Sequence, residues 1–285
     1  MIPLFGSQTF ITPYGLMLIT GLIVGWRLAR REALHANIDP SHIDFLAPMS
    51  FLIGLLAALA ISRLMVFDLQ FASAEFTAQA RGRLPIIVTF GALTIFVYSR
   101  LNALSFRGLL DIFTLPTLAT IVAVRIGCFM AGCCWGDLAV SHDALANHSI
   151  ANQVQTLPWL SGHLSALSVT FPAGSFAFEQ HLALGLVDSS NSHSLPVHPV
   201  QLYEVATVLL LLIVLRKFPL SGSRPGSLAG IATAAYASLR FLLEFVRADG
   251  ALVLEWLSVV QVECVVLLVL AVIAIRINRM AAFDR

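Results

Sequence analysis

The chain has 285 residues, of which 58% are hydrophobic and 12% are charged, and its mean hydropathy is +0.86. Soluble domains are about 45–50% apolar and about 25% charged, so this composition excludes a soluble globular protein and predicts an integral membrane protein. The formal net charge of +1 provides no broad positive field, so we expect no nucleic-acid partner.

Seven apolar segments, each about as long as a membrane-spanning helix, can be followed along the chain. They cover about 14–30, 45–67, 84–98, 109–134, 198–215, 227–245 and 254–275, and the third is short for a span. We therefore predict an all-α integral membrane protein of about seven transmembrane helices, with residues 1–285 forming a single polytopic membrane domain. A long loop at about 136–197 separates the fourth segment from the fifth.

Basic residues beside these segments predict their orientation. Three of them, Arg81, Arg83 and Arg247, lie on one side of the predicted membrane. Eleven lie on the other side, namely Arg27, Arg30, Arg31, Arg100, Arg107, Arg216, Lys217, Arg224, Arg276, Arg279 and Arg285. Because cytoplasmic loops carry an excess of Lys and Arg, we expect the N-terminus outside and the C-terminus in the cytoplasm. The 136–197 loop then lies outside the cytoplasm.

That loop is long for a compact membrane protein, and long loops are usually functional or disordered. Its stretch from Val169 to Gly185 is apolar enough to fold back onto the membrane surface. Two interpretations are open at this point: a surface lid or docking site for a second substrate, and a plain solvated loop.

The fourth segment closes on RIGCFMAGCCWGD, which spans residues 125–137 and places Arg125 inside an apolar run. An ionised side chain at membrane depth costs at least about 2.5–3.5 kcal/mol on insertion scales, so it rarely persists without a polar partner or a function. Gly127, Gly132 and Gly136 lack side chains and allow another helix or a lipid headgroup to come close. A buried arginine–carboxylate pair within tight helix packing is the alternative.

Three of the four cysteines, Cys128, Cys133 and Cys134, fall in the same stretch, while Cys264 is expected to pack inside the seventh segment. Cys128 lies one helical turn beyond Arg125, whose positive charge would activate a nucleophilic thiol. A disulfide on the oxidising side and simple packing are also open. A zinc site is disfavoured, because C-x4-C-C is not a usual structural spacing and a fourth ligand is missing, so we expect no metal.

A second polar cluster, HPVQLYE, stands at residues 198–204, where the chain re-enters the predicted membrane. His198, Gln201 and Glu204 follow one another at spacings of three, so they share part of one helical face. The alternative is a helix that begins at the membrane interface with Tyr203 as its aromatic anchor.

The third polar cluster lies in the sixth segment. Tyr236, Arg240, Glu244 and Arg247 follow at steps of four, four and three, which places them on one stripe that faces protein or water. With Arg125, three guanidinium groups then approach one membrane face, and guanidinium binds phosphate through two hydrogen bonds. We therefore predict an outward-facing site for an anionic lipid headgroup. A lone Arg240–Glu244 pair is the structural alternative.

Together these motifs resemble the prolipoprotein diacylglyceryl transferase family. The resemblance rests on PYGLML in the first segment, RIGCF followed by WG in the fourth, HPVQLYE, and RFLLEFVRAD, so it runs from residue 13 to about 261. It implies a bacterial inner-membrane enzyme of seven spans, with its active site toward the periplasmic side. The implied reaction moves diacylglyceryl from phosphatidylglycerol to the lipobox cysteine thiol of a preprolipoprotein and leaves glycerol phosphate. The resemblance implies no metal or soluble cofactor.

The resemblance also implies roles for individual residues. Arg125 and Arg240 would hold the lipid phosphate, with Tyr14 and Tyr236 beside the site. The predicted catalytic set is Arg125, Arg240, Tyr236, Tyr14, His198, Glu204 and Cys128. The predicted substrate-binding set is Arg125, Arg240, Gly127, Gly136, Gln201, Tyr203, Glu244 and Arg247.

The chain departs from the family pattern in two places. In the signature, Cys128 and Ala131 stand where the family has Asn, and Cys133 stands where it has Glu. In the third segment, the family's His-Gly-Gly begins with Phe90 here, so the histidine is absent.

If that histidine usually accepts the thiol proton, His198 and Glu204 are the nearest substitutes. Two alternatives to the family reaction therefore stay open. One is a paralogue that transfers a lipid group to another acceptor, through Cys128 or Cys133. The other is a non-catalytic protein that binds or transports an anionic lipid.

Overall fold

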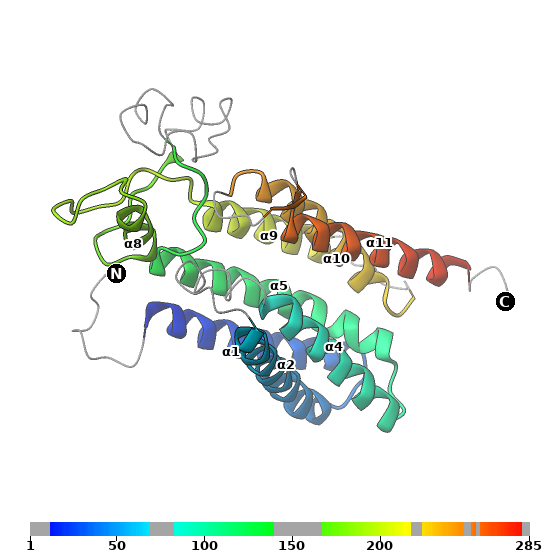
Figure 1. Cartoon of the computed structure of the whole chain (residues 1–285). Helices are drawn as coiled ribbons and strands as arrows, with labels where there is room; N and C mark the ends of the chain where they lie inside the picture. The colour runs from blue at the N-terminus through cyan, green and yellow to red at the C-terminus, as the bar shows by residue number, and fades with distance from the viewer. Residues whose placement is uncertain are drawn as a thin grey trace. The chain divides into compact units, whose positions relative to one another are not determined.

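The computed structural model describes residues 12–68, 83–139, 167–217, 224–247, 252–254 and 257–280. A long helix lies at each of the seven predicted segments (Figure 1). These helices are α1 (Pro13–His35), α2 (Pro40–Asp68), α4 (Arg83–Leu101), α5 (Phe106–Ala131), α9 (Val200–Lys217), α10 (Ser227–Glu244) and α11 (Val259–Met280). A short helix, α8 (Phe176–Ala183), precedes α9, and β1 (Leu252–Leu254) pairs with β2 (Leu257–Ser258) before α11.

Three helical stretches in the described parts of the chain are long and apolar enough to cross a membrane. They are Pro40–Ile61, Phe106–Ala131 and Val259–Asn278, and Ile86–Leu101 is a shorter apolar helix. A helix satisfies its own backbone hydrogen bonds, which a lipid environment requires. The prediction of a helical membrane protein is confirmed in this coarser form, and the count of seven spans and the orientation stay predictions.

Helix α5 ends at Ala131, three residues before the predicted end at residue 134. Gly132 adopts a left-handed φ of +67°, and its N–H donates to the Phe129 carbonyl at 3.1 Å. The next N–H, of Cys133, reaches back to the Cys128 carbonyl at 3.1 Å. This pair of bonds is a Schellman cap, which a glycine in the left-handed region makes possible.

Helix α11 begins at Val259 rather than at the predicted residue 254, because a capping box fixes its start. The Ser258 hydroxyl accepts the Gln261 N–H at 3.1 Å, and the Gln261 side chain accepts the Ser258 N–H at 2.9 Å. Each side chain thus satisfies a backbone donor that the first turn of a helix leaves open.

The chain falls into two compact units, and each is described by itself. The first contains Met1–Ile23, Leu118–Pro219 and Ile231–Ile273, and the second contains Val24–Thr117, Leu220–Gly230 and Ala274–Arg285. In the second unit, α2 and α4 approach closely, since a Cβ at Gly54 would lie only 2.5 Å from the Ile87 carbonyl oxygen. Its hydrophobic core consists of Ala29, Ala33, Ile43, Leu46, Ile95, Leu109 and Ile112.

The described part of the long loop, residues 167–197, is packed around a hydrophobic core of its own within the first unit. The core consists of Trp135, Leu138, Phe171, Ala177, Leu186 and Val197. Ser175 caps α8 by accepting the Phe178 N–H at 3.2 Å. His181 is fully buried, and its Nδ1 accepts the Leu195 N–H at 3.2 Å. A plain solvated loop was therefore the wrong interpretation for this part.

Candidate active site

The first unit brings α1 against α5 at two small residues. A Cβ at Gly127 would lie 2.9 Å from Met17 Cβ and 3.4 Å from Tyr14 Cα, so only glycine allows this approach. At the next crossing, the Thr120 hydroxyl donates to the Gly21 carbonyl at 3.0 Å. Gly127 therefore packs against a helix, which places Tyr14 beside the end of α5. The predicted substrate contact of Gly127 stays a prediction.

Arg125 is held by a buried carboxylate. Its Nε lies 2.9 Å from Glu204 Oε2, and the Glu204 side chain is 1% exposed. The other oxygen, Oε1, accepts a hydrogen bond from the Tyr236 hydroxyl at 2.9 Å. Helix α9 lies beside α10 in this unit (Figure 1), so one glutamate joins side chains of α5, α9 and α10. Three predicted catalytic residues are thus brought together.

Arg240 is held in the same way by a second buried carboxylate. Its Nη1 lies 2.7 Å from Glu244 Oε2, and Arg247 Nε lies 3.7 Å from the same oxygen. The Ser258 hydroxyl donates to Glu244 Oε1 at 3.0 Å. Glu244 therefore links the polar stripe of α10 to the capped start of α11.

These two clusters leave hydrogen-bonding capacity for an anion. Glu204 contacts Arg125 at Nε, the guanidinium nitrogen that is bonded to the side-chain carbon Cδ. The fork of two terminal nitrogens has no further partner within the described residues, and the Arg125 side chain remains 13% exposed. A guanidinium fork matches the geometry of two phosphate oxygens. The buried glutamates orient the arginines without using this fork on Arg125.

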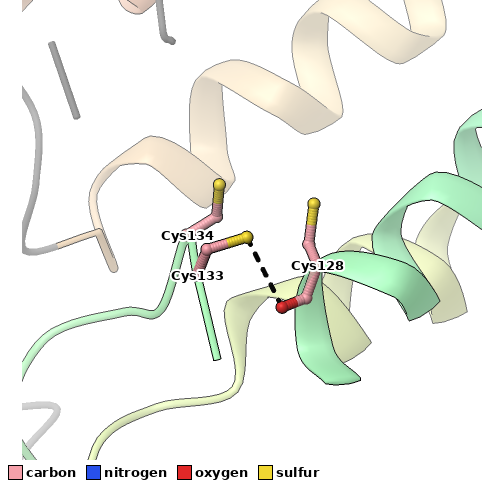
Figure 2. Close-up of side chains that lie close together, drawn as sticks. All are labelled: Cys128, Cys133 and Cys134. Atoms are coloured by element: carbon pink, nitrogen blue, oxygen red, sulfur yellow. Dashed lines mark hydrogen bonds between the residues drawn. The ribbon is translucent and has the colours of Figure 1, made fainter. Parts of the chain in front are cut away.

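The cysteine-rich turn follows the cap of α5. Cys128 is buried, and Cys133 and Cys134 are half-buried (Figure 2). The Cys133 thiol points toward the Cys128 carbonyl at 3.5 Å, and the Gln201 amide donates to the Cys133 carbonyl at 2.5 Å. All four cysteines are free thiols in this structure.

Gly136 joins this turn to the start of α9. Its N–H donates to the His198 carbonyl at 2.8 Å, and the Asp137 N–H donates to the Val246 carbonyl at 2.8 Å. A side chain at Gly136 would collide with Val200 and lie 2.7 Å from the Val246 oxygen. Gly136 therefore serves packing here, and its predicted substrate contact stays a prediction.

His198 and Tyr203 form a pair at the start of α9. Nδ1 of His198 lies 3.3 Å from the Tyr203 hydroxyl, and the His198 side chain is 1% exposed. Nε2 is buried and has no hydrogen-bond partner in the part of the chain that the structure describes.

Phe90, which replaces the family histidine, belongs to the second unit. It lines an apolar cavity of about 340 Å³ together with Phe45, Met49, Ile53, Leu93, Thr94, Val97, Tyr98 and Leu101. The position therefore offers an aromatic ring to apolar neighbours and no proton acceptor.

Two contributors to the site were missed from the sequence. Ser258 donates to Glu244, and Gln261 holds Ser258 in place; their Ser-x-x-Gln spacing is the capping-box signal that would have revealed them.

The fold and these contacts define a helical membrane protein with a buried arginine–carboxylate–tyrosine site. The model of one family, described as prolipoprotein diacylglyceryl transferase, matches residues 4–277, which is nearly the whole chain. The chain belongs to the prolipoprotein diacylglyceryl transferase family, and the family expected from the sequence motifs is confirmed.

Three relatives show how far this similarity extends, and each is named phosphatidylglycerol–prolipoprotein diacylglyceryl transferase. One from Nitratidesulfovibrio vulgaris strain Miyazaki F is 26% identical over 282 residues, covering 94% of this chain and 90% of the relative. One from Methylococcus capsulatus is 24% identical over 280 residues, covering 91% of this chain and 88% of the relative. One from Vibrio vulnificus strain YJ016 is 30% identical over 156 residues, covering 54% of this chain and 42% of the relative.

Proposed function

We propose that this protein transfers the diacylglyceryl group of phosphatidylglycerol to the lipobox cysteine thiol of a preprolipoprotein. The observation that carries the proposal is the pair of arginines from two helices, Arg125 and Arg240, each held by its own buried glutamate. Family membership over nearly the whole chain supports the reaction class. The proposed reaction needs a fixed positive site for a phosphate ester, and two arginines oriented by buried carboxylates support this assignment.

In the proposed reaction, the acceptor thiol releases its proton to water, and the resulting thiolate attacks the glycerol carbon that carries the phosphate. A sulfur–carbon bond forms, the carbon–oxygen bond breaks, and glycerol phosphate leaves with the bonding electrons. Negative charge grows on the phosphate oxygen as the bond breaks. Arg125 and Arg240, already oriented by their carboxylates, stabilise that charge without reorganising, which is the main source of electrostatic catalysis.

The remaining site residues have supporting roles in this proposal. Glu204 and Glu244 orient the arginines, and the Tyr236 hydroxyl fixes the Glu204 carboxylate. Tyr14 borders the headgroup at the end of α5, and Arg247 adds a third cation beside Glu244.

The start of α9 and the turn after α5 complete the proposed pocket. Gln201 fixes the cysteine turn through its hydrogen bond to the Cys133 carbonyl, and Tyr203 and His198 form the adjoining wall. Gly127 and Gly136 allow the close packing that holds these elements together, because a side chain at either position would meet Met17 or Val200.

The proposed setting is the inner membrane of a bacterium, with the chain as one polytopic domain of seven spans. The excess of basic residues on one side supports an outside N-terminus, a cytoplasmic C-terminus and a site that opens toward the periplasm. Its partners are then phosphatidylglycerol, a precursor protein with a lipobox, and the bilayer itself.

The test uses purified protein in detergent, phosphatidylglycerol labelled in its acyl chains, and two lipobox peptides that differ only by Cys or Ser. We expect label on the Cys peptide alone. Arg125→Lys and Arg240→Lys keep the charge but lose the guanidinium fork, so each should reduce transfer by about 100-fold or more. The exposed Arg30, whose pair with Asp44 is at the surface, provides the matched control Arg30→Lys. Full transfer in either site variant would refute the phosphate clamp.

The replacement of the family histidine by Phe90 favours a second candidate function, the binding of an anionic lipid without transfer. The same arginine site would then hold the headgroup, and no base would act on a thiol. In the labelling experiment, this candidate predicts saturable binding of phosphatidylglycerol that depends on Arg125 and Arg240, with both peptides unlabelled. Transfer to the Cys peptide would exclude it.

A further inference from the structure

The three thiols at the end of α5 form a cluster that takes no part in the arginine site. The Sγ atoms of Cys128, Cys133 and Cys134 all lie within 4.8 Å of one another. Figure 2 shows the three side chains gathered at the end of α5, from the last turn of the helix and the turn that follows. All three sulfurs are in the free form, so each can donate one ligand atom.

The helix cap explains why such an unusual spacing brings the sulfurs together. The Schellman bond from Cys133 N–H to the Cys128 carbonyl returns the chain over the last helical turn. Cys134 then adopts a left-handed φ of 60°, which a side-chain-bearing residue rarely takes and which turns the chain a second time. Backbone strain of this kind is concentrated at functional sites. The C-x4-C-C spacing thus allows the three sulfurs to bind one metal ion.

The distances fit a metal bound by thiolates. Zinc–sulfur bonds of about 2.3 Å place the sulfurs of a tetrahedral site about 3.8 Å apart, so the cluster needs to contract by at most about 1 Å. Rotation about χ1 of the two half-buried cysteines can supply this movement. Three protein ligands are also the number found in catalytic zinc sites, which keep a fourth position open. Cuprous ion, the other thiolate-preferring metal, is satisfied by three sulfurs and would leave no such position.

We propose that Cys128, Cys133 and Cys134 bind one zinc ion, whose fourth position takes the acceptor thiol. This inference rests on the proposed transferase function. On coordination the acceptor S–H loses its proton to water, and the sulfur stays bound as a thiolate. Its electron pair forms the bond to the glycerol carbon, while glycerol phosphate leaves with the pair of the broken carbon–oxygen bond. The zinc ion is neither oxidised nor reduced.

Two features of the chain agree with this role. First, the reaction needs a deprotonated acceptor, and Phe90 stands in the sequence where the family pattern has a histidine. Secondly, Cys128 lies one turn from Arg125 on the same helix, so the activated thiol and the phosphate clamp belong to one end of α5. The Glu204 carboxylate already binds Arg125 and Tyr236, so it is not free to accept the proton of the acceptor thiol.

The first experiment measures metal content and ligand chemistry in the full-length protein, purified in detergent with a phosphine reductant and without chelators. We expect one zinc ion per chain by mass spectrometry, lost in Cys133→Ser and in Cys134→Ser. Cys264, a buried cysteine in α11 remote from this turn in sequence, provides the control Cys264→Ala, which should keep its zinc. Copper in place of zinc, or no metal in the wild type, would overturn the proposal.

The second experiment replaces zinc by cobalt and records the visible spectrum. Three thiolates should give intense sulfur-to-cobalt charge-transfer bands, and the Cys lipobox peptide should strengthen them by adding a fourth sulfur, while the Ser peptide should not. An unchanged spectrum with the Cys peptide would overturn the acceptor position. Transfer that continues after removal of all zinc would refute the metal site and leave the transferase standing. Bound zinc without any transfer would refute the proposed function instead.

Discussion

The ion pair between Arg125 and Glu204 offers the sharpest test of how the site is held together. Its charges lie 2.9 Å apart, and the side chains are 13% and 1% exposed, so water screens them poorly. Two unit charges about 4 Å apart attract by about 4 kcal/mol at an effective dielectric of about 20. Glu204→Gln preserves the volume and leaves Arg125 buried without its countercharge. Loss of one partner of a buried pair costs about 3–5 kcal/mol.

A double-mutant cycle with Arg125→Met and Glu204→Gln separates the pair from its surroundings. Each single variant should lower the thermal midpoint in detergent by about 10 °C, since about 1 kcal/mol shifts the midpoint of a chain of this size by about 2–4 °C. The double variant should lose much less than the sum, with a coupling energy of about 2 kcal/mol or more. The exposed pair Arg30–Asp44, at 42% and 40% exposure, gives the control cycle and should show less than about 1 kcal/mol.

Additive losses in the Arg125–Glu204 cycle would refute the reasoning. They would mean that the two side chains are stabilised independently and that Glu204 does not hold the arginine. The arginine would then need another support before it could serve as a fixed phosphate clamp.

Three further predictions concern other parts of the chain. Gly136→Ala places a methyl group 2.7 Å from the Val246 carbonyl oxygen, so we expect thermal unfolding to show a loss of about 1–3 kcal/mol in stability. Gly174→Ala is the comparison, because its added Cβ would meet no atom within 4 Å and only the positive φ would oppose it. Burial lowers the pKa of His181 to about 4, so below pH 6.5 the unfolded chain binds a proton that the folded chain does not. Stability should therefore fall as the pH drops from about 6.5 to 4, by at most about 1.4 kcal/mol per pH unit. Thermal midpoints measured across this range should show a weaker pH dependence in His181→Asn. Asp111 accepts two N–H groups at the start of α10, so Asp111→Ala should cost about 1–2 kcal/mol, and an unchanged midpoint would refute the cap.

The helices were predictable because membrane-length apolar runs leave the backbone no other structure. Their ends were predicted less well, since caps depend on a few polar residues that hydropathy does not register. Gly132 ended α5 three residues early, and the Ser258–Gln261 capping box delayed α11 by five residues relative to prediction. Both signals were present in the sequence, but an apolar run conceals them.

Contacts within one helix of the site could also be predicted, whereas contacts between helices could not. Helical periodicity placed Arg240 and Glu244 together, and the structure finds them 2.7 Å apart. Periodicity within one helix cannot show that Glu204 lies against Arg125, because that contact depends on how α9 packs against α5. The same limit applies to the long loop, whose packed core joins Trp135 to residues more than thirty positions away.

The chemistry of the acceptor bears on what the cysteine cluster can do. If Cys128 attacked the lipid itself, it would become a diacylglyceryl thioether, and the second step would have to expel a thiolate in place of a phosphate ester. A thiolate is the poorer leaving group, so this covalent route would stop after one turnover. A cluster whose sulfurs remain unalkylated avoids this difficulty, because it holds the acceptor and lets the phosphate leave from the arginine site. Intact-mass measurement after turnover should therefore find no lipid on Cys128, Cys133 or Cys134, and an adduct there would favour the covalent route.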